Sequence, residues 1–169
     1  SHPNAGVVGP KIRGWSDREL LLEVGVTVTS DGRRWTGLEA GEHDQGQHAE
    51  PTRVLSVSSA GMLIRREVWD RLRGLDRAIP MFRDDLDFCW RVNNAGWDVV
   101  IAPKAVFWHA EAAARGERRI SAGVSRPHFE DRQHALYAVT VNHPGRFPVL
   151  TFLRLFFWSL LRAVGLVLN

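Results

Sequence analysis

The sequence predicts a mixed α/β fold, in which a mixed sheet with flanking helices is followed by a separate apolar helix. Short β-rich runs occur at residues 6–12, 24–29 and 53–58. Two segments, residues 62–72 and 84–94, place apolar residues at helical spacing. Because strand-like and helix-like segments alternate along the chain, an α/β architecture is expected.

Length and composition favour one globular domain with a sizeable core in a chain of 169 residues. Cys89 is the single cysteine, which excludes a disulfide framework and a cysteine-rich zinc site. The formal charge is +3, and the arginines are scattered among acids, so anionic partners are only weakly indicated. Aromatic residues are not interleaved with a basic patch, and nucleic-acid binding is therefore not expected. The chain begins without methionine and stops at an apolar run, which indicates a piece of a longer protein.

The first half of the chain predicts strands and a long loop. Residues 6–12 resemble a short strand interrupted by Pro10, and the later β-rich runs resemble further strands. Between those runs, residues 37–52 are rich in polar residues and lack periodicity, which predicts an irregular loop. Such loops are often functional.

Two helices are predicted in the middle of the chain. The first lies between Met62 and Leu72, before a stop at Gly74. The second begins near Asp84, because an acid in a first turn is favoured by the helix dipole, and ends within residues 94–96. Its predicted buried face contains Phe88, Cys89 and Val92.

The remaining elements are two apolar runs and two helices. Residues 97–101 and 105–108, separated by Pro103, predict either two strands or one strand broken by a turn. A helix is predicted over residues 129–142, and the segment Pro144 to Pro148 should break it.

The apolar segment 149–168 is long enough to cross a bilayer, but Arg154 and Arg162 make a span costly. An amphipathic helix at a membrane interface, with both arginines reaching the headgroups, fits better. The alternative is a core helix whose partner lies outside this chain. We therefore divide the chain into residues 1–145 and an apolar helix, residues 146–169.

The adjacent acids Asp84 and Asp85 are the strongest sign of chemistry. Like charges raise one another's pKa, and a carboxylate tuned in this way can accept a proton from a hydroxyl nucleophile. The alternative is an ordinary helix start whose acids complement the dipole. Asp85 and Asp87 resemble a metal-chelating pair, but residues two apart on a helix point in different directions. Asp87 should instead cap, brace a loop or pair with Arg91, four residues later.

Two further groups are weaker candidates. His109 ends an apolar run, where an imidazole either binds a metal or makes a structural hydrogen bond. The loop from Glu42 to His48 contains Asp44 and Gln45 among other acid, amide and imidazole groups, but its spacing matches no zinc pattern. A substrate-contacting or ordering role is favoured over a metal site, and a merely solvated loop is the remaining alternative.

Several motifs together resemble the second half of a family-two glycosyltransferase of the GT-A type. The motifs are Ser59 to Arg66, Gly74 to Asp76, Asp84 to Arg91, Ala95 to Trp97, Pro103 to Ala105, and His109. The resemblance is closest over residues 54–109. It implies a partial GT-A-like sheet, a nucleotide-sugar donor, a divalent metal (Mg or Mn) and an inverting transfer.

By position, the resemblance places the family's Glu-Asp pair on Asp84 and Asp85, with Asp where Glu is more usual. Asp85 would then be the base that deprotonates the acceptor hydroxyl, and His109 a metal ligand. Asp76 falls on a Gly-x-Asp turn and is expected to be structural. The candidate substrate-binding residues are Asp84, Gly61, Asp44, Gln45 and Arg91.

The family's nucleotide-binding half and its Asp-x-Asp loop do not occur in this sequence, so this chain alone is not expected to catalyse. It is similar to the acceptor-side part of larger bacterial enzymes that build cell-envelope glycans. The resemblance implies a glycan or lipid-linked acceptor, and a location at the cytoplasmic face of the membrane, reached through the C-terminal helix. The alternative is a non-catalytic membrane-docking module or a module that binds a glycan or protein.

Overall fold

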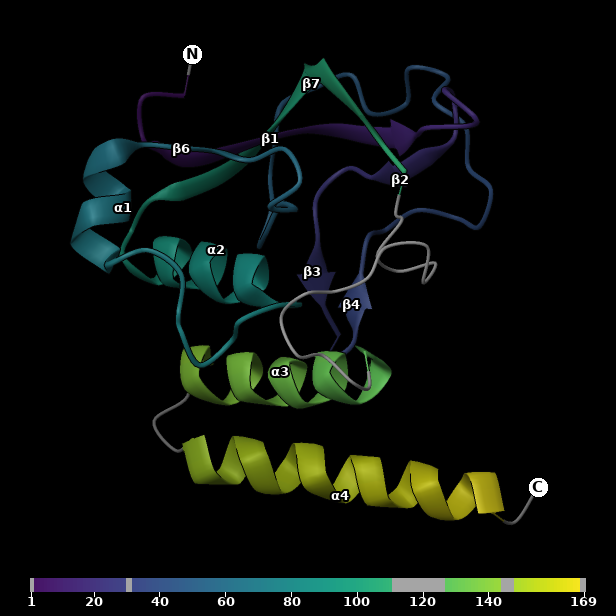
Figure 1. Cartoon of the computed structure of the whole chain (residues 1–169), viewed down its shortest axis with the longest axis vertical. Coiled ribbons are helices and arrows are strands. Elements are labelled where there is room, and N and C mark those ends of the chain that lie inside the picture. Colours follow the sequence, from purple (N-terminus) through teal and green to yellow (C-terminus); the bar gives the residue numbers. More distant parts are fainter. Residues whose placement is uncertain (1, 30–31, 111–126, 144–147, 168–169) are drawn as a thin grey trace.

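The computed structural model describes residues 2–29, 32–110, 127–143 and 148–167. Figure 1 shows successive layers, with the sheet followed by α2, α3 and finally α4. The elements are β1 (Ala5–Gly14), β2 (Leu21–Glu23), β3 (Thr27–Val28), β4 (Arg34–Trp35), β5 (Thr52–Arg53), β6 (Leu63–Ile64), α1 (Arg66–Leu72), α2 (Asp84–Asn94), β7 (Asp98–His109), α3 (Pro127–Asn142) and α4 (Pro148–Val167). The predicted mixed α/β fold with a C-terminal helix is confirmed.

Two long parallel strands, β1 and β7, form the centre of the sheet. β2 and β6 pair antiparallel with β1, and β5 pairs antiparallel with β7. The register of β1 and β7 shifts after Pro10, which faces Ala102, because Lys11 then faces Val106. Residues 103–105 therefore have no partner in β1. The predicted interruption at Pro103 is thus a bulge in one strand rather than a boundary between two strands.

The β-rich runs 24–29 and 53–58 form less strand than predicted. Only Thr27–Val28 of the first run and Thr52–Arg53 at the start of the second are strands, with an isolated bridge between Val26 and Ser56. The predicted loop 37–52 is irregular over almost all its length. Ion pairs of Asp44 with Lys11 and Arg13, more than thirty residues earlier in the chain, hold this loop, and local sequence patterns do not predict them.

The helix predicted from Met62 begins four residues later, because Leu63 and Ile64 pair with β1 as the strand β6. Pairing with a strand more than fifty residues away therefore overrides the local helical spacing. α1 ends as predicted before Gly74, through a left-handed residue, Arg73 (φ 61°). The bounds of α2 match the prediction at both ends.

α2 is buried on two sides, and this position explains its apolar composition. Phe88, Cys89 and Val92 pack against Val7 and Val99 of the sheet, which confirms the predicted buried face. Another cluster joins the opposite side of α2 to α3 and α4. Its members are Ile79, Leu86, Trp90, Ala138, Val139 and Leu155. The start of α2 is thereby held between the sheet and the C-terminal helices.

α3 contains the predicted helix 129–142, and α4 packs on it through the buried side chain of Leu155. No helix in the described residues is long and apolar enough to cross a membrane. The predicted break lies outside the described residues, apart from Pro148, the first residue of α4. The side chain of Arg162, predicted to reach headgroups, is likewise outside the described part.

Candidate active site

Asp85 lies in the first turn of α2, where the described residues bond to its carboxylate only through backbone N–H groups. Oδ1 accepts from the N–H of Leu86 at 2.7 Å, and Oδ2 accepts from the N–H of Ser59 at 3.2 Å. Within the described residues no arginine or lysine forms an ion pair with it. The side chain is half-buried. These bonds orient the carboxylate.

Two further carboxylates are close enough to Asp85 for its negative charge to affect them. Burial, and then the charge of Asp85, raises the pKa of Asp84 above its ordinary value. Burial also raises the pKa of Glu23, at the end of β2, with a smaller contribution from Asp85. Glu23 is 3% exposed, and its Oε1 accepts from the N–H of Ser58 at 2.8 Å. The consecutive N–H groups of Ser58 and Ser59 therefore hold Glu23 and Asp85.

Glu23 also forms an ion pair with Arg34 of the β3–β4 hairpin. Without this partner a buried carboxylate would be costly, so the pair ties the hairpin to the site. Sequence analysis missed Glu23. The available signal was an acid between Leu22 and Val24, in a segment that otherwise resembles a buried strand.

The chain enters α2 through two consecutive left-handed residues, Phe82 (φ 57°) and Arg83 (φ 67°). Such conformations are unfavourable for residues other than glycine and persist where surrounding contacts fix them. Here Arg83 donates to both carboxylate oxygens of Asp131 on α3, at 2.7 and 2.8 Å. His134 of α3 bonds through Nδ1 to the carbonyl of Met81 at 2.6 Å. α3 thus holds the turn that presents Asp84 and Asp85.

The loop containing Ser59 also reaches the far part of β7, where His109 is the last residue. A Cβ added to Gly61 would lie 2.9 Å from Pro10 Cγ, so glycine permits the close approach to β1, and Phe107 of β7 is in ordinary contact range at 3.5 Å. His109 is half-buried opposite Gly14. The loop therefore lies between the Asp85 carboxylate and the end of β7, which Figure 1 shows crossing the molecule toward β2.

The described residues do not by themselves complete a metal site. No group of three His, Cys, Asp or Glu side chains among them is arranged to hold an ion. His109 could supply one ligand, but the described part of the chain brings no further pair of such ligands to it. Mg²⁺ is commonly bound by one or two protein ligands together with substrate phosphates and water, so a single histidine does not define such a site by itself.

Asp87 and Arg91 form the intrahelical ion pair that their four-residue spacing predicted. Asp87 is 1% exposed and accepts from Arg91 Nε at 2.9 Å and from Asn142 Nδ2 at 2.7 Å. Arg91 also donates to the carbonyls of Leu72 and Gly74, at 2.9 and 2.8 Å, and so caps the end of α1. The Arg91 guanidinium, a candidate for substrate binding, thus forms its hydrogen bonds within the protein. Its contact with a substrate stays a prediction.

The loop residue Asp44 is held by side chains of β1. Asp44, with a side chain 3% exposed, bonds to Lys11 at 2.8 Å and to Arg13 at 2.5 Å, both on β1. Burial alone would raise the pKa of Asp44, but bonds from Lys11, Gly46 and Arg13 lower it well below its usual range. Asp44 thus anchors the loop, and its neighbour Gln45 is exposed. Their predicted substrate contacts remain untested.

Two other side chains have clear roles. Burial raises the pKa of Cys89 to about 12, so its thiol is not a nucleophile at neutral pH. Asp76 accepts from the N–H of Ala78 at 2.9 Å and from the hydroxyl of Tyr137 at 2.8 Å. These bonds brace the turn after α1 against α3, as expected of a structural aspartate.

Comparison with known proteins adds three findings. A family model described as "Glycosyltransferase like family 2" matches residues 2–124. An uncharacterized protein, y4gI, of Sinorhizobium fredii is 36% identical over 120 residues, which cover 68% of this chain and 13% of that protein. The O-antigen biosynthesis protein RfbC of Myxococcus xanthus is 31% identical over 116 residues, 67% of this chain and 9% of that protein. The chain thus spans about a tenth of the length of these curated relatives.

Proposed function

This chain belongs to glycosyltransferase family 2, and on that premise we propose that it forms the acceptor-side part of an inverting glycosyltransferase. The enzyme would move a sugar from a nucleotide-sugar donor to a glycan or lipid-linked acceptor of the cell envelope. The name of the Myxococcus xanthus relative, an O-antigen biosynthesis protein, supports this class of acceptor. The observation that carries the proposal is the Asp85 carboxylate, oriented by backbone N–H groups and without a cationic partner in the described residues.

In this mechanism Asp85 is the general base. It takes the proton from an acceptor hydroxyl while the hydroxyl oxygen attacks the anomeric carbon of the donor sugar. The new bond joins that oxygen to the anomeric carbon, and the bond to the nucleotide diphosphate breaks, with its electron pair leaving on the diphosphate. Attack from the side opposite the leaving group inverts the configuration. Asp84 would position the acceptor beside the base.

The direct test is sugar transfer by the full-length protein, with donors surveyed by release of nucleoside diphosphate. Asp85→Asn should reduce turnover by about 10²- to 10⁴-fold, the usual contribution of a general base. Asp70→Asn is the matched control, because Asp70 is an exposed acid on α1 whose ion pair with Arg66 is on the surface. Unchanged turnover in Asp85→Asn would remove Asp85 from the base role. Absence of turnover in the unaltered protein would favour the non-catalytic interaction module.

The proposed enzyme uses a divalent metal, Mg²⁺ or Mn²⁺, for which we name one protein ligand. Such ions bind the diphosphates of nucleotide substrates. We assign His109 as one ligand, with the others outside the described residues. His109→Ala should then raise the Mn²⁺ concentration needed for half-maximal turnover. An unchanged Mn²⁺ requirement would remove His109 from the metal site.

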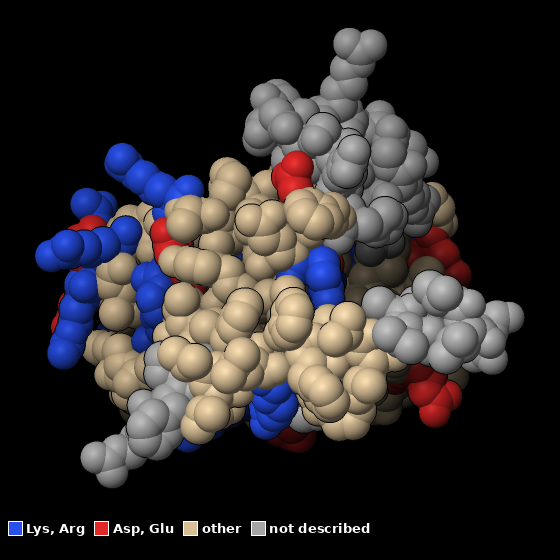
Figure 2. Space-filling view, turned by 90° about the horizontal axis from the view of Figure 1, so that it is seen from below, with Lys and Arg blue, Asp and Glu red and all other residues tan. Residues whose placement is uncertain are grey.

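The exposed apolar side chains of α4 support the proposed association with a membrane surface, which we place at the cytoplasmic face as part of the proposal. Its exposed large apolar residues are Val149, Leu150, Phe152, Leu153, Phe156, Phe157, Trp158, Leu160 and Leu161. Figure 2 shows the face seen from below as a broad surface of uncharged residues, with basic side chains among and beside them and a few acidic side chains around the edge. An apolar patch of this kind marks an interaction site, and the basic side chains favour anionic headgroups.

Sedimentation with phosphatidylglycerol vesicles tests this docking. The double substitution Phe156→Ser and Phe157→Ser should reduce the vesicle-bound fraction several-fold, because it removes two apolar side chains from the face of α4. Trp15→Ser is the control, since Trp15 is similarly exposed (60%) but follows β1. Equal loss in both variants, or no binding by the unaltered protein, would contradict membrane docking.

A further inference from the structure

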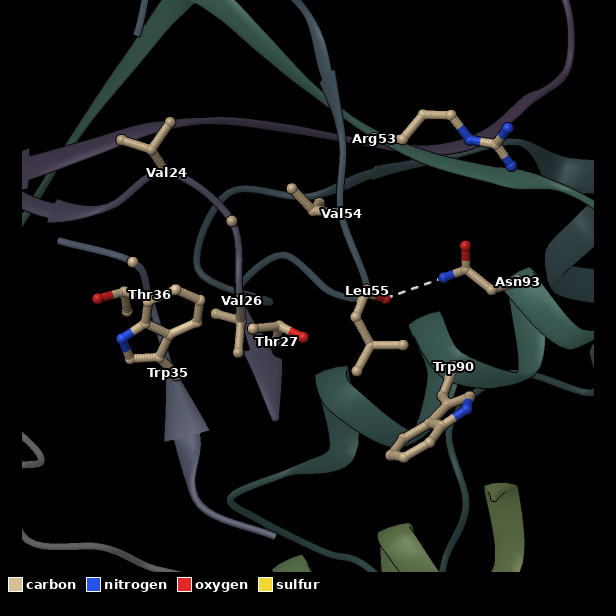
Figure 3. Close-up of a pocket in the computed structure, with 12 residues that line it drawn as sticks. Val24, Val26, Thr27, Trp35, Thr36, Arg53, Val54, Leu55, Trp90 and Asn93 are labelled. Carbon is tan, nitrogen blue, oxygen red and sulfur yellow. Dashed lines mark hydrogen bonds between the residues drawn. The ribbon is translucent and has the colours of Figure 1, made fainter. Parts of the chain in front are cut away.

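A cavity of about 450 Å³ opens between the β3–β4 hairpin and α2, outside the carboxylate cluster. Figure 3 shows the indoles of Trp35 and Trp90 on opposite sides of Thr27 and Leu55. This volume is within the range of roughly 300–1,000 Å³ that is typical of small-molecule sites. The cavity is therefore large enough to admit a ligand rather than a few waters.

The lining combines apolar surfaces with a few hydroxyl groups. Val26, Leu55 and the buried indole of Trp90 form apolar walls, while Trp35 on β4 is 57% exposed. Thr27 and Thr36 add hydroxyl groups. Among the described residues the Thr27 hydroxyl has no hydrogen-bond partner. Such a lining suits a ligand with one apolar face and polar edges better than a wholly apolar chain.

The cavity and the carboxylate site share two segments of backbone. Val24, which lines the cavity, directly follows Glu23, and Trp35 directly follows Arg34. The ion pair between Glu23 and Arg34 therefore fixes the position of the hairpin that carries Trp35. Because neighbouring residues of extended chain point to opposite sides, the cavity lies behind the carboxylates rather than among them.

We propose that this cavity binds a sugar ring of the acceptor glycan, one or more units away from the hydroxyl that reacts. The C–H groups on one face of a pyranose would stack on the Trp35 indole, whose π face is negative. The ring hydroxyls would bond to Thr27 and Thr36. This inference rests on the proposed function and adds to it that the acceptor is an oligosaccharide held at a second place.

Indole N–H signals in ¹H–¹⁵N NMR spectra of the full chain test the inference without any donor. The probes are methyl glycosides of glucose, galactose, mannose and rhamnose, and their disaccharides. At least one sugar should shift the Trp35 signal in a saturable way and leave the Trp15 signal unchanged. Trp35→Ala should weaken that binding by about tenfold or more, measured from the Trp90 signal, whereas Trp15→Ala should not.

Trp35→Phe is the second variant, because it keeps an aromatic face and should restore most of the binding. Circular dichroism spectra that match the unaltered protein establish that each variant is folded. Saturable binding of farnesol at Trp35 without any sugar binding would overturn the inference, and so would equal shifts at Trp15 and Trp35 or no shift with any probe.

The proposed catalysis can fail separately from this inference. Asp85→Asn should leave sugar binding in the cavity unchanged, because Asp85 does not line it. Turnover that survives Asp85→Asn would refute the base assignment while the cavity still bound sugars. Loss of turnover in Asp85→Asn together with no sugar binding would refute only the cavity.

Discussion

Asp85 and Asp87 are two positions apart on α2, and their surroundings are opposite. Asp85 is half-buried, and the described residues bond to it only through the N–H groups of Leu86 and Ser59. Asp87 is 1% exposed and bonds to the side chains of Arg91 and Asn142. One carboxylate therefore has only backbone partners in the described residues, and the other is part of a buried side-chain network.

The difference shows why an Asp-x-Asp pattern alone does not identify a metal site. On a helix the two side chains point in directions about 200° apart, so they meet different neighbours. Asp87 is buried, where Arg91 supplies the opposite charge and Asn142 donates a neutral hydrogen bond. A carboxylate paired in this way contributes to structural order. Asp85 has no such ion pair in the described part of the chain, which is compatible with the base role proposed for it.

The largest expected effect comes from Asp87→Ala. This change leaves Arg91 and Asn142 without their acceptor in a buried region, so the free energy of unfolding should fall by about 3–5 kcal/mol. Urea unfolding followed by circular dichroism measures the loss.

Asp85→Ala is the matched control. Its cost should stay within about 1 kcal/mol, because the described residues bond to this half-buried carboxylate only through backbone N–H groups. Equal losses for the two variants would abolish the distinction between a structural and an available carboxylate.

Much of this distinction could be predicted from the sequence. The bounds of α2, its buried face and the Asp87–Arg91 pair all follow from helical spacing, which is a local property. The start of α1 could not be predicted, because Leu63 and Ile64 join a strand formed by Val7 and Val8. Sheet pairing of this kind depends on residues far away in the sequence.

The candidate site was predicted only in part, for the same reason. Adjacent acids at a helix start mark Asp84 and Asp85 locally. Glu23 precedes Asp85 by 62 positions in the chain. The two carboxylates accept from consecutive N–H groups, Glu23 from Ser58 and Asp85 from Ser59. Nothing in the local pattern around Asp44 predicts its bonds to Lys11 and Arg13 on β1. Such contacts depend on tertiary structure, and local sequence patterns therefore do not predict them.

An intermediate effect is expected for Arg91→Lys, which keeps the charge and removes the planar fork. Lysine cannot serve Asp87 and the carbonyls of Leu72 and Gly74 together, so the free energy of unfolding should fall by about 1–2 kcal/mol. Thermal unfolding measures this change, and the KM for the acceptor is the second readout. A raised KM with unaltered stability would show instead that Arg91 contacts the substrate. The substrate site would then extend along α2 from Asp85 to Arg91.

The smallest effect is expected for Asp84→Asn, and its sign depends on pH. Burial and the charge of Asp85 raise the folded-state pKa of Asp84 above its ordinary value of 3.8. The native protein therefore holds this proton more tightly, so the contribution of Asp84 to stability is present below pH 3.8 and is lost as pH rises through the folded pKa. The asparagine side chain has no charge to bury, and at pH 7 the variant should be more stable by less than about 1 kcal/mol, since water screens a partly exposed group. Unfolding curves at about pH 3 and pH 7 measure the gap, which should close at the lower pH. A variant less stable than the unaltered protein at neutral pH would mean that the ionised Asp84 is itself a structural partner, and the start of α2 would then resemble its middle.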